Sequence, residues 1–149
     1  MVNDMTIQIP YNRSEKAYEW TCPESGEIFR FHGKGAAVKA DAFRFAVSML
    51  DPQLYETAVT RIEANPFIER MVWRAVELLI NDAVEESSPT LYRVMSSDQY
   101  GRYAVAMTEH GLTCQCRAFT DNPIITPQLE TLCKHITAVE LWRVLRADY

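Results

Sequence analysis

Residues 112–119, LTCQCRAF, and residues 132–139, LCKHITAV, decide the fold of the C-terminal part of this chain. They hold three of its four cysteines, as a CQC pattern followed sixteen residues later by a CKH pattern. Three thiolates and one imidazole are a standard ligand set for structural zinc, which takes four protein ligands in tetrahedral geometry. The spacing therefore predicts one structural Zn²⁺ ion, and its four ligands are Cys114, Cys116, Cys133 and His135.

The two patterns also indicate which elements present these ligands. Residues i and i+2 of a strand point to the same face, so a strand lets Cys114 and Cys116 face one ion. The same spacing in a helix places side chains about 200° apart. Cys133 must therefore lie at or before the start of a helix, with His135 in its first turn. There the positive end of the helix dipole also favours thiolates.

The residues around the two patterns complete a small β-sheet and a helix. Residues 91–95 and 102–109 have strand composition, and the second of these runs alternates cleanly between two faces. Together with residues 112–119 they predict a three-stranded antiparallel sheet. Residues 130–149 have apolar side chains at helical spacing and predict a helix that packs on this sheet.

The N-terminal part of the chain has a different pattern. Residues 17–22 and 28–32 predict a β-hairpin around a turn that contains Pro23 and Gly26. Helical spacing of apolar residues then follows in a middle block. The block holds three predicted helices, at about residues 41–50, 52–64 and 66–85. We therefore predict an α+β protein with two domains, an N-terminal one at residues 1–89 and a zinc-finger unit at residues 90–149.

Composition limits the classes of function. The 149 residues carry a net charge of −5, and all of it lies in residues 1–100, because residues 101–149 hold five basic and five acidic residues. A strongly basic nucleic-acid-binding domain is therefore absent from the composition, although a local basic patch remains compatible with it. No run approaches the roughly 18 apolar residues of a membrane span. Residues 1–16 lack the pattern of a signal peptide, and we expect a protein of the reducing cytosol.

Two other interpretations of the cysteines stay open at this point. The three cysteines and the histidine could pack in a small hydrophobic core, or Cys114 and Cys116 could form a redox pair, although redox motifs usually have CxxC spacing. Catalysis is not expected. The chain has no HExxH motif and no zinc-deaminase motif. A catalytic zinc site also keeps one position open for water, whereas four protein ligands fill this one.

The CxC and CxH patterns resemble the SWIM-type zinc finger. The likeness covers roughly residues 91–146 and includes Phe119 after the CxC pattern and Ala138-Val139 after the CxH pattern. This resemblance implies a zinc-stabilised ββα unit that binds DNA or protein and has no catalytic role. It covers only the C-terminal part of the chain, and residues 1–89 belong to no family that we can name.

The first hypothesis for function is direct binding of nucleic acid, DNA rather than RNA. Arginines on the predicted strands can align on one sheet face, and Tyr92, Tyr100 and Tyr103 lie near them in sequence. Basic and aromatic groups together are typical of nucleic-acid surfaces. The alternative, which ranks slightly first, is the ordinary exposed face of a sheet. The candidate contacts are Arg93, Arg102, Arg117, Lys134 and Arg143.

The second hypothesis ranks close to the first. The acidic N-terminal part, the neutral finger and the lack of catalytic motifs also fit a protein-interaction module, or an accessory subunit of a larger assembly that could contain nucleic acid. Its docking face would lie in the helical block around Trp73. Neither hypothesis requires a membrane or a small-molecule substrate.

Overall fold

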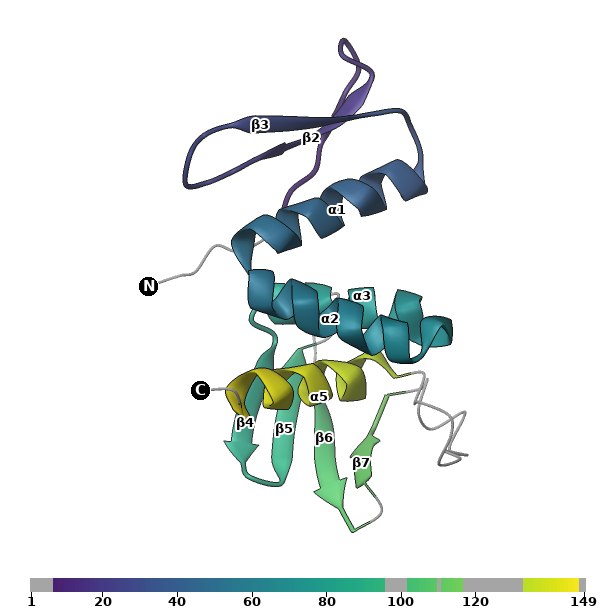
Figure 1. Ribbon diagram of the computed structural model, residues 1–149. Helices are drawn as coiled ribbons and strands as arrows, with labels where there is room; N and C mark the ends of the chain where they lie inside the picture. The colour runs from purple at the N-terminus through teal and green to yellow at the C-terminus, as the bar shows by residue number, and fades with distance from the viewer. Residues whose placement is uncertain (1–6, 96–101, 110, 117–132, 148–149) are drawn as a thin grey trace. The chain divides into compact units, whose positions relative to one another are not determined.

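The computed structural model describes residues 7–95, 102–109, 111–116 and 133–147. These residues form two compact units, Met1–Glu56 and Thr57–Tyr149 (Figure 1). Each unit combines an antiparallel sheet with helices. The predicted α+β class is therefore confirmed.

The first unit contains a three-stranded sheet in the order β1-β2-β3 and one long helix, α1. Tyr11 pairs with Tyr18 across β1 and β2, and Tyr18 pairs with Phe31 across β2 and β3. The predicted hairpin is thus present and gains a short third strand. The elements are β1 (Tyr11–Asn12), β2 (Ala17–Thr21), β3 (Ile28–His32) and α1 (Ala36–Leu50).

Aromatic side chains join this sheet to helix α1. Phe45 of α1 contacts the rings of Trp20, Phe29 and Phe31, with centroids 4.8–6.1 Å apart. Trp20 is buried, and aromatic rings in such tilted contacts stabilise a core beyond the area that they bury. The alternation of strand side chains explains the arrangement, because Trp20 and Tyr18 share a face of β2.

Three helical elements follow: α2 (Pro52–Ala64), the 3₁₀ turn η1 (Pro66–Ile68) and α3 (Glu69–Ile80). The Asp51 carboxylate accepts a hydrogen bond from the Leu54 N–H at 3.1 Å, and the Asn65 side chain accepts one from the Phe67 N–H at 3.3 Å. Each of these capping residues directly precedes a proline. Proline suits the first helical position, because a backbone N–H there would have no partner within the helix. The predicted breaks between helices after residues 50 and 64 are therefore confirmed.

The second unit contains a four-stranded antiparallel sheet in sequence order, β4-β5-β6-β7. Val105 of β6 pairs with Tyr92 of β5 on one side and with Cys114 of β7 on the other. This register places buried residues of neighbouring strands on one face. The strands are β4 (Val84–Ser88), β5 (Leu91–Met95), β6 (Arg102–Thr108) and β7 (Gly111–Cys114).

Helix α5 (Lys134–Ala147) lies between this sheet and α3 (Figure 1). Tyr92 of the sheet packs edge-on against Trp142, with ring centroids 5.6 Å apart. Residues 135–139 are all buried, because a helix between two layers must be covered on all sides. In the middle of α5, the Glu140 carboxylate accepts a 2.8 Å hydrogen bond from Arg61 of α2.

Several boundaries differ from the prediction. Helix α1 begins at Ala36, immediately after Gly35 at φ +117°, whereas the sequence predicted a helix from about residue 41. Helix α3 ends at Ile80, because Asp82 adopts a left-handed φ of +55° that a helix cannot contain. Residues 84–88, whose first two positions were predicted as the end of a helix, instead form β4, which is why the sheet has four strands and not three.

The proposed division of the chain into residues 1–89 and 90–149 stays a prediction. Within the second compact unit, α3 packs against α5. A core is therefore shared between helices from before and after residue 90.

Candidate metal centre

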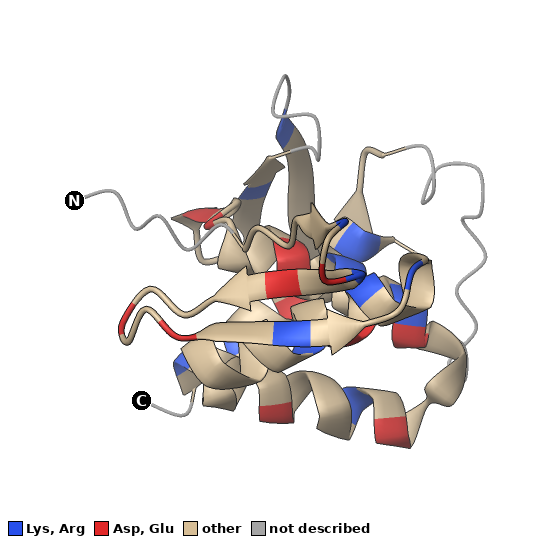
Figure 2. Ribbon diagram, turned by 90° about the horizontal axis from the view of Figure 1, so that it is seen from above, with Lys and Arg blue, Asp and Glu red and all other residues tan. Residues whose placement is uncertain are grey.

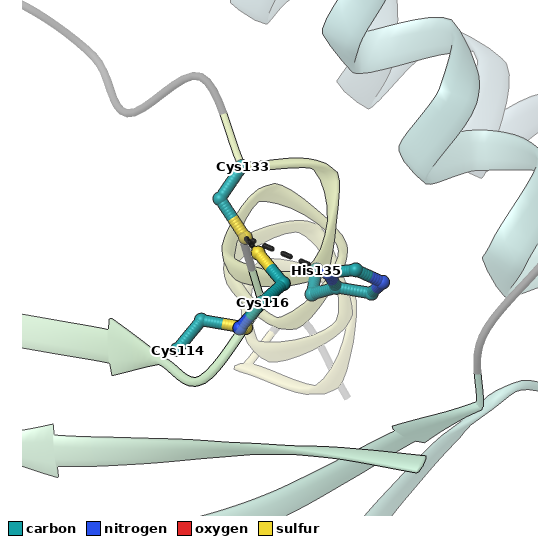
Figure 3. A group of neighbouring side chains, drawn as sticks. All are labelled: Cys114, Cys116, Cys133 and His135. Carbon is teal, nitrogen blue, oxygen red and sulfur yellow. Dashed lines mark hydrogen bonds between the residues drawn. The ribbon is translucent and has the colours of Figure 1, made fainter. Parts of the chain in front are cut away.

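The end of one strand and the start of one helix bring the four predicted ligands together (Figure 3). Cys114 is the last residue of β7, and Cys116 follows two positions later. Cys133 directly precedes α5, and His135 lies in the first turn of that helix. The predicted position of the helix start is thus confirmed.

The ligand atoms of these four residues all lie within 4.8 Å of one another. The Sγ atoms of Cys116 and Cys133 are 3.2 Å apart, and the Cys133 Sγ lies 3.6 Å from Nδ1 of His135. Tetrahedral zinc with ordinary Zn–S and Zn–N bonds requires ligand atoms roughly 3.5–3.8 Å apart. The cluster can therefore hold one metal ion after only small side-chain adjustments.

The two cysteines of the CxC pattern lie at the end of a strand and just beyond it. Strand β7 ends at Cys114, and the chain bends at Cys116. The backbone N–H of Cys116 donates to the Cys114 Sγ at 3.5 Å. A donor of this kind stabilises negative charge on sulfur, which a metal-bound thiolate carries.

The start of α5 is fixed by a residue that the sequence patterns did not single out. The carbonyl of Cys133 accepts both the backbone N–H of Thr137 at 3.2 Å and its hydroxyl at 3.0 Å. These bonds hold Cys133 at the N-terminal end of the helix. The position of a threonine four residues after Cys133 is the signal that could have revealed it.

The cluster is closed to solvent. None of Cys114, Cys116, Cys133 and His135 exposes more than 5% of its surface. An ion held by all four would have every tetrahedral position filled by protein, as in structural zinc sites. The donor set and its burial thus fit a structural metal ion.

The surroundings of Cys133 favour its neutral thiol when no cation is present. A hydrogen bond with Cys114 and then burial raise the pKa of Cys133 to about 12, against a smaller lowering by His135. Without a cation this thiol stays protonated at neutral pH, because several buried thiolates would lie side by side without compensation. A divalent cation reverses the preference, since metal ligands must be deprotonated.

The imidazole of His135 directs one ring nitrogen toward the cysteine sulfurs and the other away from them. Nδ1 faces Cys133, whereas Nε2 points away from the three cysteines (Figure 3). The ring of Tyr103 packs on the imidazole, with centroids 4.5 Å apart at 40°. Nε2 is buried and finds no hydrogen-bond partner among the residues that the structure describes. Nδ1 is therefore the nitrogen available to a metal.

The predicted nucleic-acid contacts do not form one surface. Arg93 and Arg102 are exposed on the same face of the sheet, because Arg93 pairs with Ala104 and side chains two positions apart share a face. Lys134 and Arg143 lie on α5, which packs on the opposite face of the sheet. Arg117 lies outside the described residues. Basic and acidic residues are interspersed along the elements of the described part (Figure 2).

The tyrosines expected beside these arginines point the other way. Tyr92 is buried against Trp142, and Tyr103 packs on His135. Their strand positions explain this, because both alternate with the arginines and so face α5. Tyr100 lies outside the described residues. The predicted mixed basic and aromatic sheet face is therefore wrong in its aromatic part.

Searches of protein-family models, of curated proteins and of solved structures give no significant match to this chain. The likeness to the SWIM-type finger thus rests on the CxC and CxH sequence patterns, and the buried cluster is compatible with a zinc finger. Among the described residues, no helix has the length and apolar character needed to cross a bilayer.

Proposed function

We propose that the C-terminal unit is a SWIM-type zinc finger whose Cys114, Cys116, Cys133 and His135 bind one structural Zn²⁺. The observation that carries this proposal is the burial of all four ligand atoms within 4.8 Å of one another. The CxC and CxH patterns and the order strand, loop and helix support the family assignment. Zinc suits this set because thiolate and imidazole are the ligands that it prefers.

The ion would act by stabilising the fold and not by catalysis. Four protein ligands leave no position for a substrate or for an activated water. Zinc would connect the end of β7 to the start of α5, two points that are separated by the sixteen residues between Cys116 and Cys133. Closing such a loop limits the conformations of the unfolded chain and so stabilises the folded unit.

The function that we propose for this unit is binding of nucleic acid, with DNA as the first candidate. Arg93 and Arg102 support it, because both are exposed on the sheet face opposite to α5. The Glu85 carboxylate lies 3.4 Å from the Arg102 guanidinium. An ion pair as exposed as this one contributes little, so phosphate can replace the carboxylate at low cost.

A salt series with labelled duplex DNA tests this proposal. The zinc-loaded protein should bind less tightly as salt rises, and each phosphate contact adds about 0.9 to the slope of log K against log salt. Arg93→Ala and Arg102→Ala should each lower the slope by about that amount. Arg70→Ala, an exposed arginine on α3, serves as the control. Equal binding by the double variant and the parent would reject this surface.

A specific observation favours protein docking as the second candidate. Phe67, in the turn between α2 and α3, exposes 97% of its surface although its backbone is held by the Asn65 cap. Aromatic residues, phenylalanine included, are enriched at protein interfaces relative to the rest of the surface. It lies six residues before Trp73, in the block predicted to hold the docking face. Phe67→Ala should abolish capture of a partner from the native host, whereas retained capture would contradict this candidate.

A further inference from the structure

The first unit contains a surface cleft of about 550 Å³ that the zinc site does not use. Its size lies in the range of ordinary ligand clefts. Two aromatic and three basic side chains line it, and all belong to residues 11–34. They are Tyr11, Arg13, Lys16, Tyr18 and Lys34.

The two tyrosines form a fixed wall of this cleft. Tyr11 and Tyr18 face each other across β1 and β2, and their rings meet edge to face with centroids 5.0 Å apart. The Tyr18 hydroxyl accepts a hydrogen bond from the Gly35 N–H at 3.4 Å. Tyr18 is thus positioned by its ring contact with Tyr11 and by its hydrogen bond with Gly35. Both tyrosine rings remain partly exposed.

The three cations approach these tyrosines from two turns. Arg13 and Lys16 are exposed in the turn between β1 and β2. Lys34 stands between Gly33 at φ +120° and Gly35 at φ +117°, conformations that favour glycine and turn the chain sharply. This bend carries the Lys34 Nζ to 5.8 Å from the centroid of the Tyr11 ring, within reach of a cation–π contact.

The charge around the cleft is positive, although the whole chain is acidic. Residues 28–40 hold three basic and no acidic residues. Glu19 points to the other face of β2 and is bound to Arg30 at 2.7 Å. Glu15 is the one acidic residue between the two tyrosines, and its side chain is exposed in the turn. The lining residues therefore hold three positive charges and no negative charge.

We propose that this cleft binds single-stranded nucleic acid. The cations would contact consecutive phosphates, and a base would stack on the exposed part of the tyrosine wall. Such sites combine a basic groove with aromatic stacking, which tolerates any base sequence. A single strand fits better than a duplex, because stacking on a side chain requires a base that is free of its neighbours. This inference shares only the class of ligand with the proposed function, and it uses different residues in the other unit.

The test is binding of the full zinc-loaded chain to labelled oligothymidylate and oligouridylate across a salt series. Each phosphate contact to a single strand adds about 0.7 to the salt slope, so Lys16→Ala and Lys34→Ala should each lower it by that amount. Tyr11→Ala should weaken binding at least about fivefold, whereas Tyr11→Phe should bind as the parent does. Arg70→Ala again serves as the charge-matched control, because it lies on α3 in the other unit.

Several outcomes would overturn the inference. Parent-like affinity in the double variant Lys16→Ala/Lys34→Ala would reject the cleft, provided that its melting curve matches the parent's. Equal competition by inorganic phosphate or by a sulfated oligosaccharide would show that only negative charge is recognised.

The same variants separate this inference from the proposed function. Loss of single-strand binding in Arg93→Ala/Arg102→Ala, with none in the cleft variants, would reject the cleft and leave the sheet surface standing. Loss of single-strand binding in the cleft variants, with duplex binding unaffected by the sheet variants, would support the cleft and reject the sheet surface.

Discussion

The Sγ atom of Cys133 lies 3.6 Å from Nδ1 of His135, although the two residues are only two positions apart at the start of α5. Inside a regular helix such a pair would point to nearly opposite sides. The contact exists because Cys133 precedes the helix. Its carbonyl accepts hydrogen bonds from the backbone N–H and the hydroxyl of Thr137, but Cys133 itself is not a helical residue. The helix start thus presents both residues to one site.

Removing the metal should unfold at least the C-terminal unit. Zinc binding contributes an apparent free energy of about 10–16 kcal/mol in zinc-finger peptides, whereas a whole domain is stable by about 5–15 kcal/mol. We therefore expect a strong chelator, or Cys133→Ser, to lower the melting temperature sharply in circular dichroism.

The matched control is Cys22→Ser, at the buried cysteine of the first unit. This variant should lose some stability from the core but should keep its metal. Unchanged melting after complete removal of the metal would contradict a structural role for the ion.

Zinc binding should release about three protons at pH 7, one from each thiol. The pKa of Cys133 is raised to about 12 by its hydrogen bond with Cys114 and by burial, so its proton must leave when the metal binds. Because protons compete with the metal, affinity should fall as the pH falls. Calorimetry in two buffers of different ionisation enthalpy counts the protons. Release of fewer than two would mean that not all three thiols are ligands.

Tyr103 should position His135 for the metal. Its ring packs on the imidazole at 4.5 Å, and groups that orient a metal-ligating histidine typically change affinity by about 10–100-fold when removed. We expect Tyr103→Ala to weaken zinc binding by about tenfold in a chelator competition. Tyr103→Phe keeps the ring and should bind as the parent does. Equal affinity in all three proteins would show that the contact is only packing.

The ion pair between Arg61 and Glu140 should stabilise the second unit. The pair spans 2.8 Å and is only partly exposed, so Glu140→Gln should cost about 1–2 kcal/mol in the free energy of unfolding. The control is Glu63→Gln, because Glu63 is exposed and lies on α2 together with Arg61. This variant should cost less than about 0.5 kcal/mol in the free energy of unfolding. Urea titration measures both values, and equal costs would show that the Arg61 contact adds nothing.

The metal ligands could be predicted from sequence because their chemistry is local. The CxH spacing requires a helix start, and Cys133 and His135 lie at one. The CxC spacing favours a strand, and Cys114 ends strand β7 whereas Cys116 lies just beyond it. The faces of β6 were predictable for the same reason, since alternation places Tyr103 and Val105 on one side.

The rest depended on pairing between distant residues. Strand β4 is an edge strand with the exposed sequence EES, so it shows no apolar alternation, and only its pairing with β5 defines it. The cleft was likewise hidden, because the register of Tyr11 with Tyr18 and the bend at Gly33 and Gly35 bring its lining together. The sequence also could not show that Tyr92 and Tyr103 face inward, because this depends on which face of the sheet α5 covers.

Titration with Co²⁺ tests the central claim most directly. Cobalt in a tetrahedral site with three thiolates gives intense visible and thiolate charge-transfer absorption, and zinc should abolish it by displacement. We predict a tetrahedral spectrum that saturates at one ion per chain in the parent and in Cys22→Ser. Serine at Cys114, Cys116 or Cys133 should remove about one third of the thiolate absorption or abolish binding. A spectrum that is absent, or that survives unchanged in these three variants, would contradict the metal centre.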